Sequence, residues 1–247
     1  MSSTKSSTSR VQPVFNWFSK NEEKSWPDQL LKIVTGLTIP IKAGKLVNIE
    51  LVPERKVMAS PARLAWMIEN VSMLAPKDGQ LWQELKNRIP DKQLIIDELD
   101  RLKRGDASGL DSNLRLEGAT SADCLLECEN ALVWIEGKRF DWISPSTTWD
   151  LARDQLARNL EAVWILANAA KKDYCVIICH EHPLKHHEEA LVDGYRNCSW
   201  AGGWPHISDN QRKEFSKRIG TVTWQQIAGK WKDLRTLPEL HDLSQTT

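Results

Sequence analysis

Residues 129–142, ENALVWIEGKRFDW, place two charges inside an otherwise apolar run. Glu136 and Lys138 lie two positions apart, with Gly137 between them. Residues two positions apart in a β-strand point to the same face, so both charges would share one face of a sheet. Burying two charges costs free energy unless a partner compensates them, so this pair needs a chemical explanation.

Asp123 supplies a second carboxylate that can reach the charged pair. It begins a stretch with strand pattern, and the polar turn ECEN would connect that strand to the one that carries Glu136. Such a hairpin brings Asp123 and Glu136 to the same end of the sheet, where two carboxylates suit Mg²⁺. The ion would be the missing counter-charge. Lys138 could then orient or help deprotonate a water and stabilise charge on a phosphate, as phosphodiester hydrolysis requires.

A helix is expected after the charged strand, with further polar side chains beside the pair. Thr147 is the expected N-cap, and Asp150 follows three residues later in the pattern of a capping box. Gln155, Arg158 and Asn159 share one face of this helix at spacings i, i+3 and i+4. They could form one polar patch that points toward the site or along a nucleic-acid backbone.

These residues resemble the PD-(D/E)XK nuclease superfamily, which has the restriction-endonuclease-like fold. Asp123 matches the aspartate of the family motif, and Glu136, Gly137 and Lys138 match its (D/E)-X-K part. The match is good from residue 114 to about residue 170 and loose elsewhere. The resemblance implies an α/β fold with an αβββαβ core, in which helices flank a mixed central sheet. It also implies a nuclease that uses Mg²⁺ or Mn²⁺ to hydrolyse phosphodiester bonds in nucleic acid, DNA rather than RNA.

The resemblance implies additional site residues. In several branches of the superfamily the helix after the motif supplies a glutamine or a basic residue, and Gln155 is the similar position here. The first core helix usually carries an acidic residue near the metal, for which Glu98 and Glu117 are both candidates. We favour Glu117 because it is close to Asp123 in sequence, and Glu98 stays open. The expected catalytic residues are Asp123, Glu136, Lys138 and Gln155, and the expected metal ligands are Asp123, Glu136 and Glu117.

The elements that position these residues should form three regions. Residues 1–16 begin with a stretch rich in Ser, Thr and Lys, and we expect a disordered head. Residues 17–105 are expected to be a mainly helical N-terminal extension that includes the first core helix, with one helix that begins at Pro61 after the N-cap Ser60. Residues 106–247 are expected to be the nuclease-like α/β core.

Strand patterns recur along the chain. The strand that carries Glu136 has apolar residues on both faces, so it should be central in the sheet. A last short strand should run into a terminal helix within residues 220–231. The other expected strands lie at residues 46–52, 114–117, 123–128 and 173–182, and the strand with Glu136 at 131–140.

The composition excludes fewer functions than the motif does. The 33 basic and 33 acidic side chains cancel, so a nucleic-acid partner would need a local basic patch. No apolar run approaches the roughly 20 residues that span a bilayer, and the N-terminus lacks the apolar core of a secretory signal. Five cysteines without a disulfide-like spacing fit a reducing compartment. We therefore expect a cytoplasmic protein without a membrane partner.

Other interpretations of the same residues stay open. Glu136 and Lys138 could be a plain ion pair at a strand end, and the protein a catalytically silent member of the fold that binds nucleic acid or a protein partner. A homodimer, or protein partners in a larger system, would fit either interpretation. A zinc site is disfavoured because no paired C-x-x-C appears. Its candidate ligands would be Cys175, Cys179, His180, His182, His186, His187 and Cys198.

Overall fold

In the part of the chain that the structure describes, five strands form one mixed sheet whose spatial order, β1-β2-β3-β4-β5, is also the sequence order. In the computed structural model the described residues are 7–20, 23–51, 56–70, 92–105, 117–139, 143–147, 150–181, 184, 186–199 and 203–240. β1, β2 and β3 pair antiparallel, whereas β3, β4 and β5 run parallel. The strands are β1 (Leu46–Glu50), β2 (Cys124–Cys128), β3 (Ala131–Lys138), β4 (Asp173–His180) and β5 (Ile219–Thr223). The predicted α/β class and these strands are confirmed, whereas most of the strand expected at residues 114–117 lies outside the described residues.

β3 is the central strand, and all of its residues are buried. Its apolar side chains alternate between the two faces, as the sequence predicts. Val133 and Ile135 pack into the hydrophobic core on one face, and Leu132 and Trp134 into the core on the other. Glu136 continues the face of Leu132 and Trp134.

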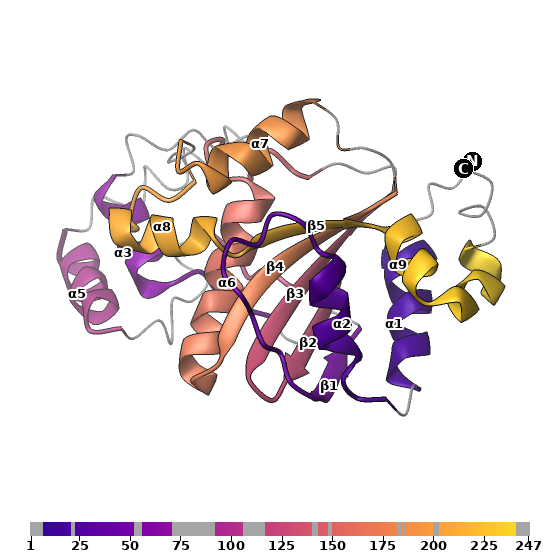
Figure 1. Ribbon diagram of the computed structural model, residues 1–247. Helices are drawn as coiled ribbons and strands as arrows, with labels where there is room; N and C mark the ends of the chain where they lie inside the picture. The colour runs from indigo at the N-terminus through magenta and orange to yellow at the C-terminus, as the bar shows by residue number, and fades with distance from the viewer. Residues whose placement is uncertain are drawn as a thin grey trace.

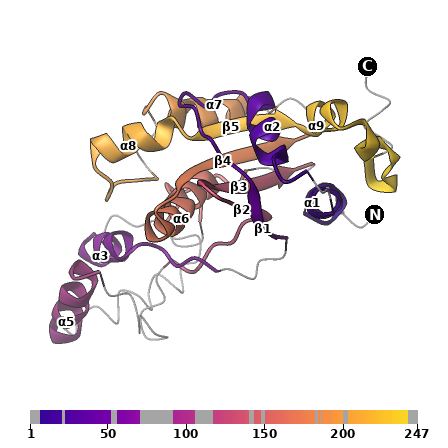
Figure 2. The same cartoon turned by 60° about the horizontal axis from the view of Figure 1, so that its bottom comes forward.

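Helices cover both faces of the sheet (Figure 1). The face of Val133 is covered by α1 (Gln12–Ser19), α2 (Trp26–Ile33), α9 (Trp224–Lys230) and the 3₁₀ helix η3 (Lys232–Thr236). The face of Trp134 is covered by α6 (Gln155–Ala170), α7 (His186–Arg196) and α8 (Asp209–Ser216). Figure 2 shows the same layers from another side. In the described parts of the chain, no helix has the length and apolar character that crossing a membrane would need.

The N-terminal segment is part of the core, which corrects the expected disordered head for residues 7–16. Residues 7–11 form a short π-helix, η1 (Ser7–Val11), and α1 follows directly. Val11, Val14, Phe15 and Phe18 are at most 1% exposed, and their spacing of i, i+3, i+4 and i+7 is a helical apolar stripe. Polar residues surround this stripe, so the composition of the segment does not reveal the helix.

The expected N-terminal extension does not stand apart from the core. β1 comes from this region and pairs with β2, so the division at residue 105 is not a boundary of the sheet. α3 (Pro61–Glu69) begins as predicted, since the Ser60 side chain accepts a hydrogen bond from Arg63 N. α3 packs against α5 (Lys92–Lys103).

α6 begins later than the sequence predicts. Its N-cap is Asp154, whose Oδ1 atom accepts a hydrogen bond from Ala157 N at 2.9 Å. Thr147 and Asp150 instead form a turn of their own, in which Thr147 Oγ1 accepts a hydrogen bond from Asp150 N at 3.1 Å. The capping box expected at Thr147 is therefore wrong. The Asp150 carboxylate accepts a hydrogen bond from Ala152 N and pairs with an arginine of α3.

Candidate active site

Four polar side chains meet at the carboxyl end of β3. Glu136 Oε1 accepts hydrogen bonds from Lys138 Nζ at 2.9 Å and from Gln155 Nε2 at 2.6 Å. Its other oxygen, Oε2, accepts one from Asn159 Nδ2 at 3.0 Å. Lys138 Nζ also donates to Gln155 Oε1 at 3.1 Å. Glu136 and Lys138 are only 5% and 6% exposed, so the pair predicted from the sequence is buried and joined to α6.

The start of α6 orients Gln155. Its backbone N–H donates to Ser144 O at 2.9 Å, and its side-chain Oε1 accepts from Ser144 N at 3.2 Å. The preceding N-cap, Asp154, is itself held by the hydroxyl of Tyr195 at 2.5 Å. Gln155 and Asn159 lie four residues apart, so one face of the first two turns presents both amides to Glu136.

Asp123 lies at the same end of the sheet. Its Oδ2 atom accepts a hydrogen bond from Gly137 N at 2.9 Å, so the carboxylate contacts the peptide that follows Glu136. The pairing of Cys124 with Ile135 places Asp123 across from Glu136. Burial raises the pKa of Cys179 on β4, and the negative charges of Asp123 and Glu136 raise it further. The hairpin thus places both predicted carboxylate residues at the same end of the sheet.

Gly137 is required by the packing on the other face of β3. A Cβ atom added to it would overlap Cγ2 of Val11, so η1 can lie on the strand only because this residue has no side chain. The next carbonyl, Lys138 O, accepts a hydrogen bond from Trp224 Nε1 at 3.3 Å. The end of β3 is therefore fixed from one face by the N-terminal segment and α9, and from the other by α6.

Glu117, the third expected metal ligand, lies in a different cluster. Its Oε2 atom accepts hydrogen bonds from Arg63 Nε at 3.0 Å and Arg153 Nε at 2.9 Å, and Arg158 lies 3.2 Å from Oε1. Burial would raise the pKa of Glu117, but Arg153, Arg63 and Arg158 outweigh it and lower the pKa. Within the described residues no group of three or more His, Cys, Asp and Glu side chains could hold a metal ion. The structure therefore groups Asp123 with Glu136 and leaves Glu117 with the arginines.

Glu98, the alternative acidic residue, lies in α5. Its side chain lies outside the described residues. Figures 1 and 2 both show α5 on the side of the molecule opposite to α9, toward which the carboxyl ends of the parallel strands point.

The cluster around Glu117 extends into a buried ion network that holds α6 against α3. Arg153 Nη2 donates to Glu161 Oε2 at 2.7 Å, and His206 Nε2 lies 3.1 Å from both oxygens of Glu161. Ser60, the N-cap of α3, also donates to Glu161. On the other side, Arg63 Nη2 donates to Asp150 Oδ2 at 2.7 Å.

The polar patch expected on α6 is divided between these two clusters. Arg158 donates to the carbonyl oxygens of Gly118 and Ala119 and pairs with Glu117, so it belongs to the ion network. Asn159, which the sequence predicts only as part of that patch, joins Gln155 on Glu136. Its Oδ1 atom is buried and accepts no hydrogen bond from the described residues. The spacing of four residues from Gln155 is the signal that could have assigned Asn159 to the site.

An ion cluster at the edge of the site was not anticipated from the sequence. Arg10 Nε donates to Glu181 Oε2 at 2.8 Å, and Arg139 Nε lies 3.2 Å from the same oxygen. Glu181 directly follows β4, and Arg139 directly follows β3. Arg10 comes from the segment expected to be disordered, so no local pattern marks it.

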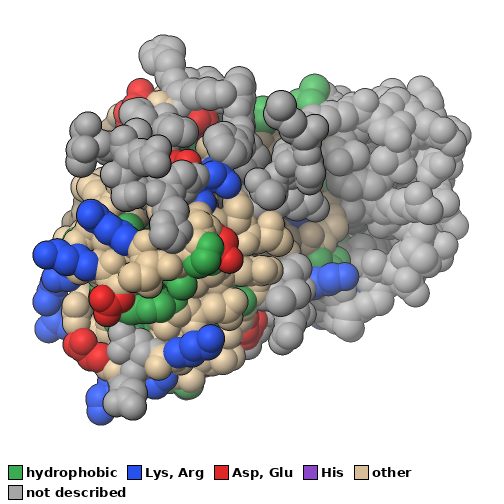
Figure 3. All heavy atoms as spheres, turned by 90° about the vertical axis from the view of Figure 1, so that its right-hand side faces the viewer, with side chains coloured by type: hydrophobic (Ala, Val, Ile, Leu, Met, Phe, Trp, Pro, Cys, Tyr) green, Lys and Arg blue, Asp and Glu red, His purple; other side chains and the backbone are tan. Residues whose placement is uncertain are grey.

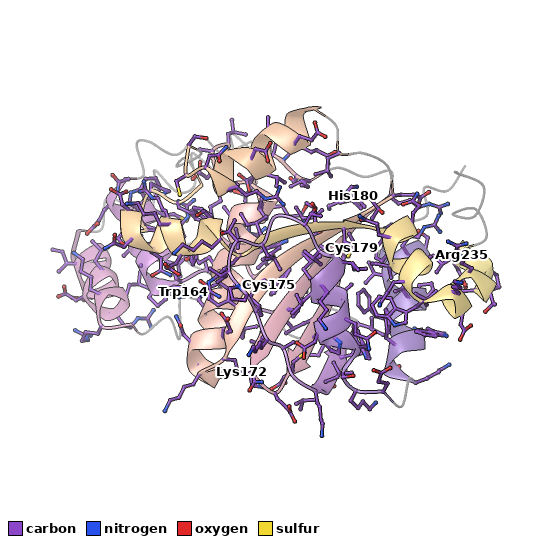
Figure 4. The ribbon with its side chains drawn as sticks, viewed as in Figure 1. Trp164, Lys172, Cys175, Cys179, His180 and Arg235 are labelled. Atoms are coloured by element: carbon purple, nitrogen blue, oxygen red, sulfur yellow. The ribbon has the colours of Figure 1, made fainter. Side chains whose placement is uncertain are left out.

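The zinc alternative gains no support from the described residues. Cys175 and Cys179 are fully buried in β4 and contribute to the core beneath α1. Figure 4 shows them along the strand, with His180 at its carboxyl end and Lys172 near the opposite end. His182 and the side chains of His186 and His187 lie outside the described residues.

Surface charge does not single out a nucleic-acid face on the side seen in Figure 3. There the Lys and Arg side chains of the described residues are interspersed with Asp and Glu. No protein-family model matches the chain, and no curated protein or solved structure matches it either.

Proposed function

We propose that the protein is a nuclease that hydrolyses phosphodiester bonds in DNA with Mg²⁺ or Mn²⁺. One observation carries this proposal. The Asp123 carboxylate accepts a hydrogen bond from the backbone of Gly137, between Glu136 and Lys138, so two carboxylates and one lysine lie at the same end of a central strand. Phosphodiester hydrolysis needs this combination of metal ligands and a cation.

The donor chemistry of the site fits Mg²⁺. Asp123 and Glu136 are hard oxygen donors, and Mg²⁺ in enzymes is often held by one or two carboxylates together with waters and substrate phosphate oxygens. Two carboxylates are therefore sufficient without Glu117. The buried Oδ1 atom of Asn159 is a further oxygen without a donor among the described residues, and it could accept a hydrogen bond from a water beside Glu136. A bound ion would supply Lewis-acid polarisation of the phosphate.

Lys138, Gln155 and Asn159 would position the reacting groups and stabilise the charge that develops on the phosphate. The Lys138 ammonium group would donate to the attacking water or to a phosphate oxygen and so stabilise the negative charge that develops there. Gln155 contacts both Lys138 and Glu136, so it would keep the ammonium group beside the carboxylate when substrate binds. Asn159 fixes the second oxygen of Glu136.

A cleavage assay tests the proposal. Plasmid, linear and single-stranded DNA would be incubated with Mg²⁺ or Mn²⁺ and the wild type, Asp123→Asn, Glu136→Gln or Lys138→Met. We expect each substitution to reduce cleavage about 100-fold or more, because each removes a charge that acts on the reacting phosphate. Circular dichroism would confirm that each variant is folded.

The chain offers a matched control pair. Glu127 Oε1 accepts a hydrogen bond from Lys172 Nζ at 3.0 Å, and this carboxylate–lysine pair lies at the opposite end of the strands from His180 (Figure 4). Glu127→Gln and Lys172→Met should therefore retain cleavage. Wild-type protein that cleaves no substrate with either metal would refute the proposal, as would equal losses in the control pair.

A catalytically silent binding protein is the second candidate. The buried Glu136–Lys138 pair favours it, because the two charges already compensate each other without a metal or substrate. This candidate predicts DNA or protein binding without cleavage, and binding that survives Glu136→Gln. Metal-dependent cleavage that is lost in Glu136→Gln would exclude it.

A further inference from the structure

A pocket lies beside the candidate active site at the same end of the sheet. It has a volume of about 340 Å³, within the range of small-ligand pockets, and lies at the carboxyl ends of β4 and β5. His180, which lines it, is the register partner of Lys138 on the neighbouring strand. Adjacent strands are about 5 Å apart, so a ligand in this pocket would be a direct neighbour of a phosphate at Lys138.

The pocket is lined by β4, β5 and α7, together with Thr35, Leu184 and Gln226 of α9. β4 contributes His180, and β5 contributes Thr221 and Thr223. From α7 come an apolar side chain, Val192, and three charged ones, which are Glu189, Asp193 and Arg196. Polar and charged side chains outnumber apolar ones in this lining, so a ligand here would be held mainly by hydrogen bonds.

The charges of the pocket disfavour a phosphate group. Arg196 donates to the backbone carbonyls of Ile219 and Thr35 at 3.4 Å and pairs with Asp193 at 3.6 Å, so its positive charge is already compensated. Glu189 is exposed and has no hydrogen bond or ion pair to another described residue, so its carboxylate oxygens can accept hydrogen bonds from a ligand. A ligand here should therefore bring N–H donors rather than negative oxygens.

We propose that this pocket binds a guanine base, which Glu189 recognises. Among the four DNA bases, guanine alone presents two neighbouring donors on one edge, N1–H and the 2-amino group, and these match the two oxygens of a carboxylate. This assignment rests on the proposed function, in which the base belongs to the nucleotide next to the scissile phosphate. The phosphate itself would lie at Asp123, Glu136 and Lys138.

Nucleoside binding tests the pocket without requiring catalysis. Guanosine, inosine, which lacks the 2-amino group, and thymidine would be titrated into the full-length protein and followed by calorimetry. We expect guanosine to bind at least about 10-fold more tightly than the other two. Glu189→Gln should abolish this difference. Glu214→Gln, an exposed carboxylate on α8, should leave it unchanged.

Cleavage mapping then separates this inference from the proposed function. A nuclease with the guanine pocket should cut preferentially beside guanine, and Glu189→Gln should lose the preference while it still cuts other sites. Cleavage without guanosine binding or guanine preference would refute the pocket and keep the nuclease. Guanosine binding that depends on Glu189, in a protein that cleaves no DNA, would keep the pocket and refute the nuclease. Equal binding of all three nucleosides would overturn the inference.

Discussion

Lys138→Met should destabilise the protein, and Mn²⁺ should reverse part of that loss. The Glu136 side chain is 6% exposed and pairs with Lys138 Nζ at 2.9 Å. Removing one partner of a buried pair costs about 3–5 kcal/mol, because the other charge stays buried without compensation. Gln155 and Asn159 still donate to the carboxylate in the variant, and such bonds contribute about 1 kcal/mol each. We therefore expect a loss near the lower limit, about 3 kcal/mol.

The double variant Glu136→Gln/Lys138→Met measures the pair itself. It removes both charges, so its stability should return to within about 1 kcal/mol of the wild type. Urea unfolding followed by circular dichroism would give the free energies of unfolding, with and without Mn²⁺. An ion held by Asp123 and Glu136 would supply the missing positive charge, and at 100 times its Kd it would add about 2.7 kcal/mol of stability to Lys138→Met.

Two results would refute this reasoning. A loss below about 1 kcal/mol in Lys138→Met would show that the pair is not energetically coupled. Equal effects of Mn²⁺ on Lys138→Met and on the double variant would show that Glu136 does not help to hold the metal, and the proposed function would lose its main support.

Three further perturbations test the surroundings of the site. Arg153→Met should lower the free energy of unfolding in urea by about 3–5 kcal/mol, because it leaves two buried carboxylates without their common partner. A loss below about 1 kcal/mol would contradict this. Burial lowers the pKa of His206 below its ordinary value of 6.5, although the bond to Glu161 opposes the shift. The unfolded chain therefore takes up a proton that the folded chain does not, and the urea midpoint should fall as the pH drops below 6.5. It should fall further below about pH 4.5, because Arg153 and His206 outweigh burial and lower the pKa of Glu161. A constant midpoint from about pH 8 to about pH 3 would be incompatible with both shifts. Gly137→Ala should cost about 1–3 kcal/mol of stability and lower the thermal midpoint, because the added methyl group overlaps the N-terminal segment. Gly229→Ala on α9 should leave the thermal midpoint unchanged, since the nearest atom to its added methyl group is 3.9 Å away.

The sequence predicts the site where local patterns carry the information. A polar turn followed by the apolar run that ends at Glu136 defines the hairpin. The hairpin register alone then brings Asp123 to the same end of the sheet. The i, i+4 spacing on α6 contains Gln155 and Asn159. All of these relations span fewer than 40 residues, so periodicity and turn chemistry are enough to find them.

Contacts between distant segments escape such patterns. Glu117 is predicted to be a metal ligand because it is close to Asp123 in sequence. In the structure it instead forms ion pairs with Arg63 and Arg153. The apparent cap at Thr147 forms a turn because the Asp150 carboxylate pairs with Arg63, which lies 87 residues away in sequence. Arg10 bonds Glu181 across 171 residues. Ion pairs between distant residues leave no periodic trace, so composition and spacing cannot reveal them.

The two buried clusters share one helix, and this links the stability of the protein to its proposed chemistry. α6 presents Gln155 and Asn159 to Glu136, while Glu161 on the same helix enters the ion network. The network fixes the register of α6, because Glu161 bonds Arg153, Ser60 and His206. A site that needs both amides on one carboxylate tolerates only one register, since a shift by a single residue rotates the helix by about 100°. Arg153, directly before the N-cap of α6, joins its ion pairs to the start of the helix. Loss of Arg153 should therefore reduce activity in protein that is still folded, whereas the loss of Lys172 at the far end of the sheet should reduce stability alone.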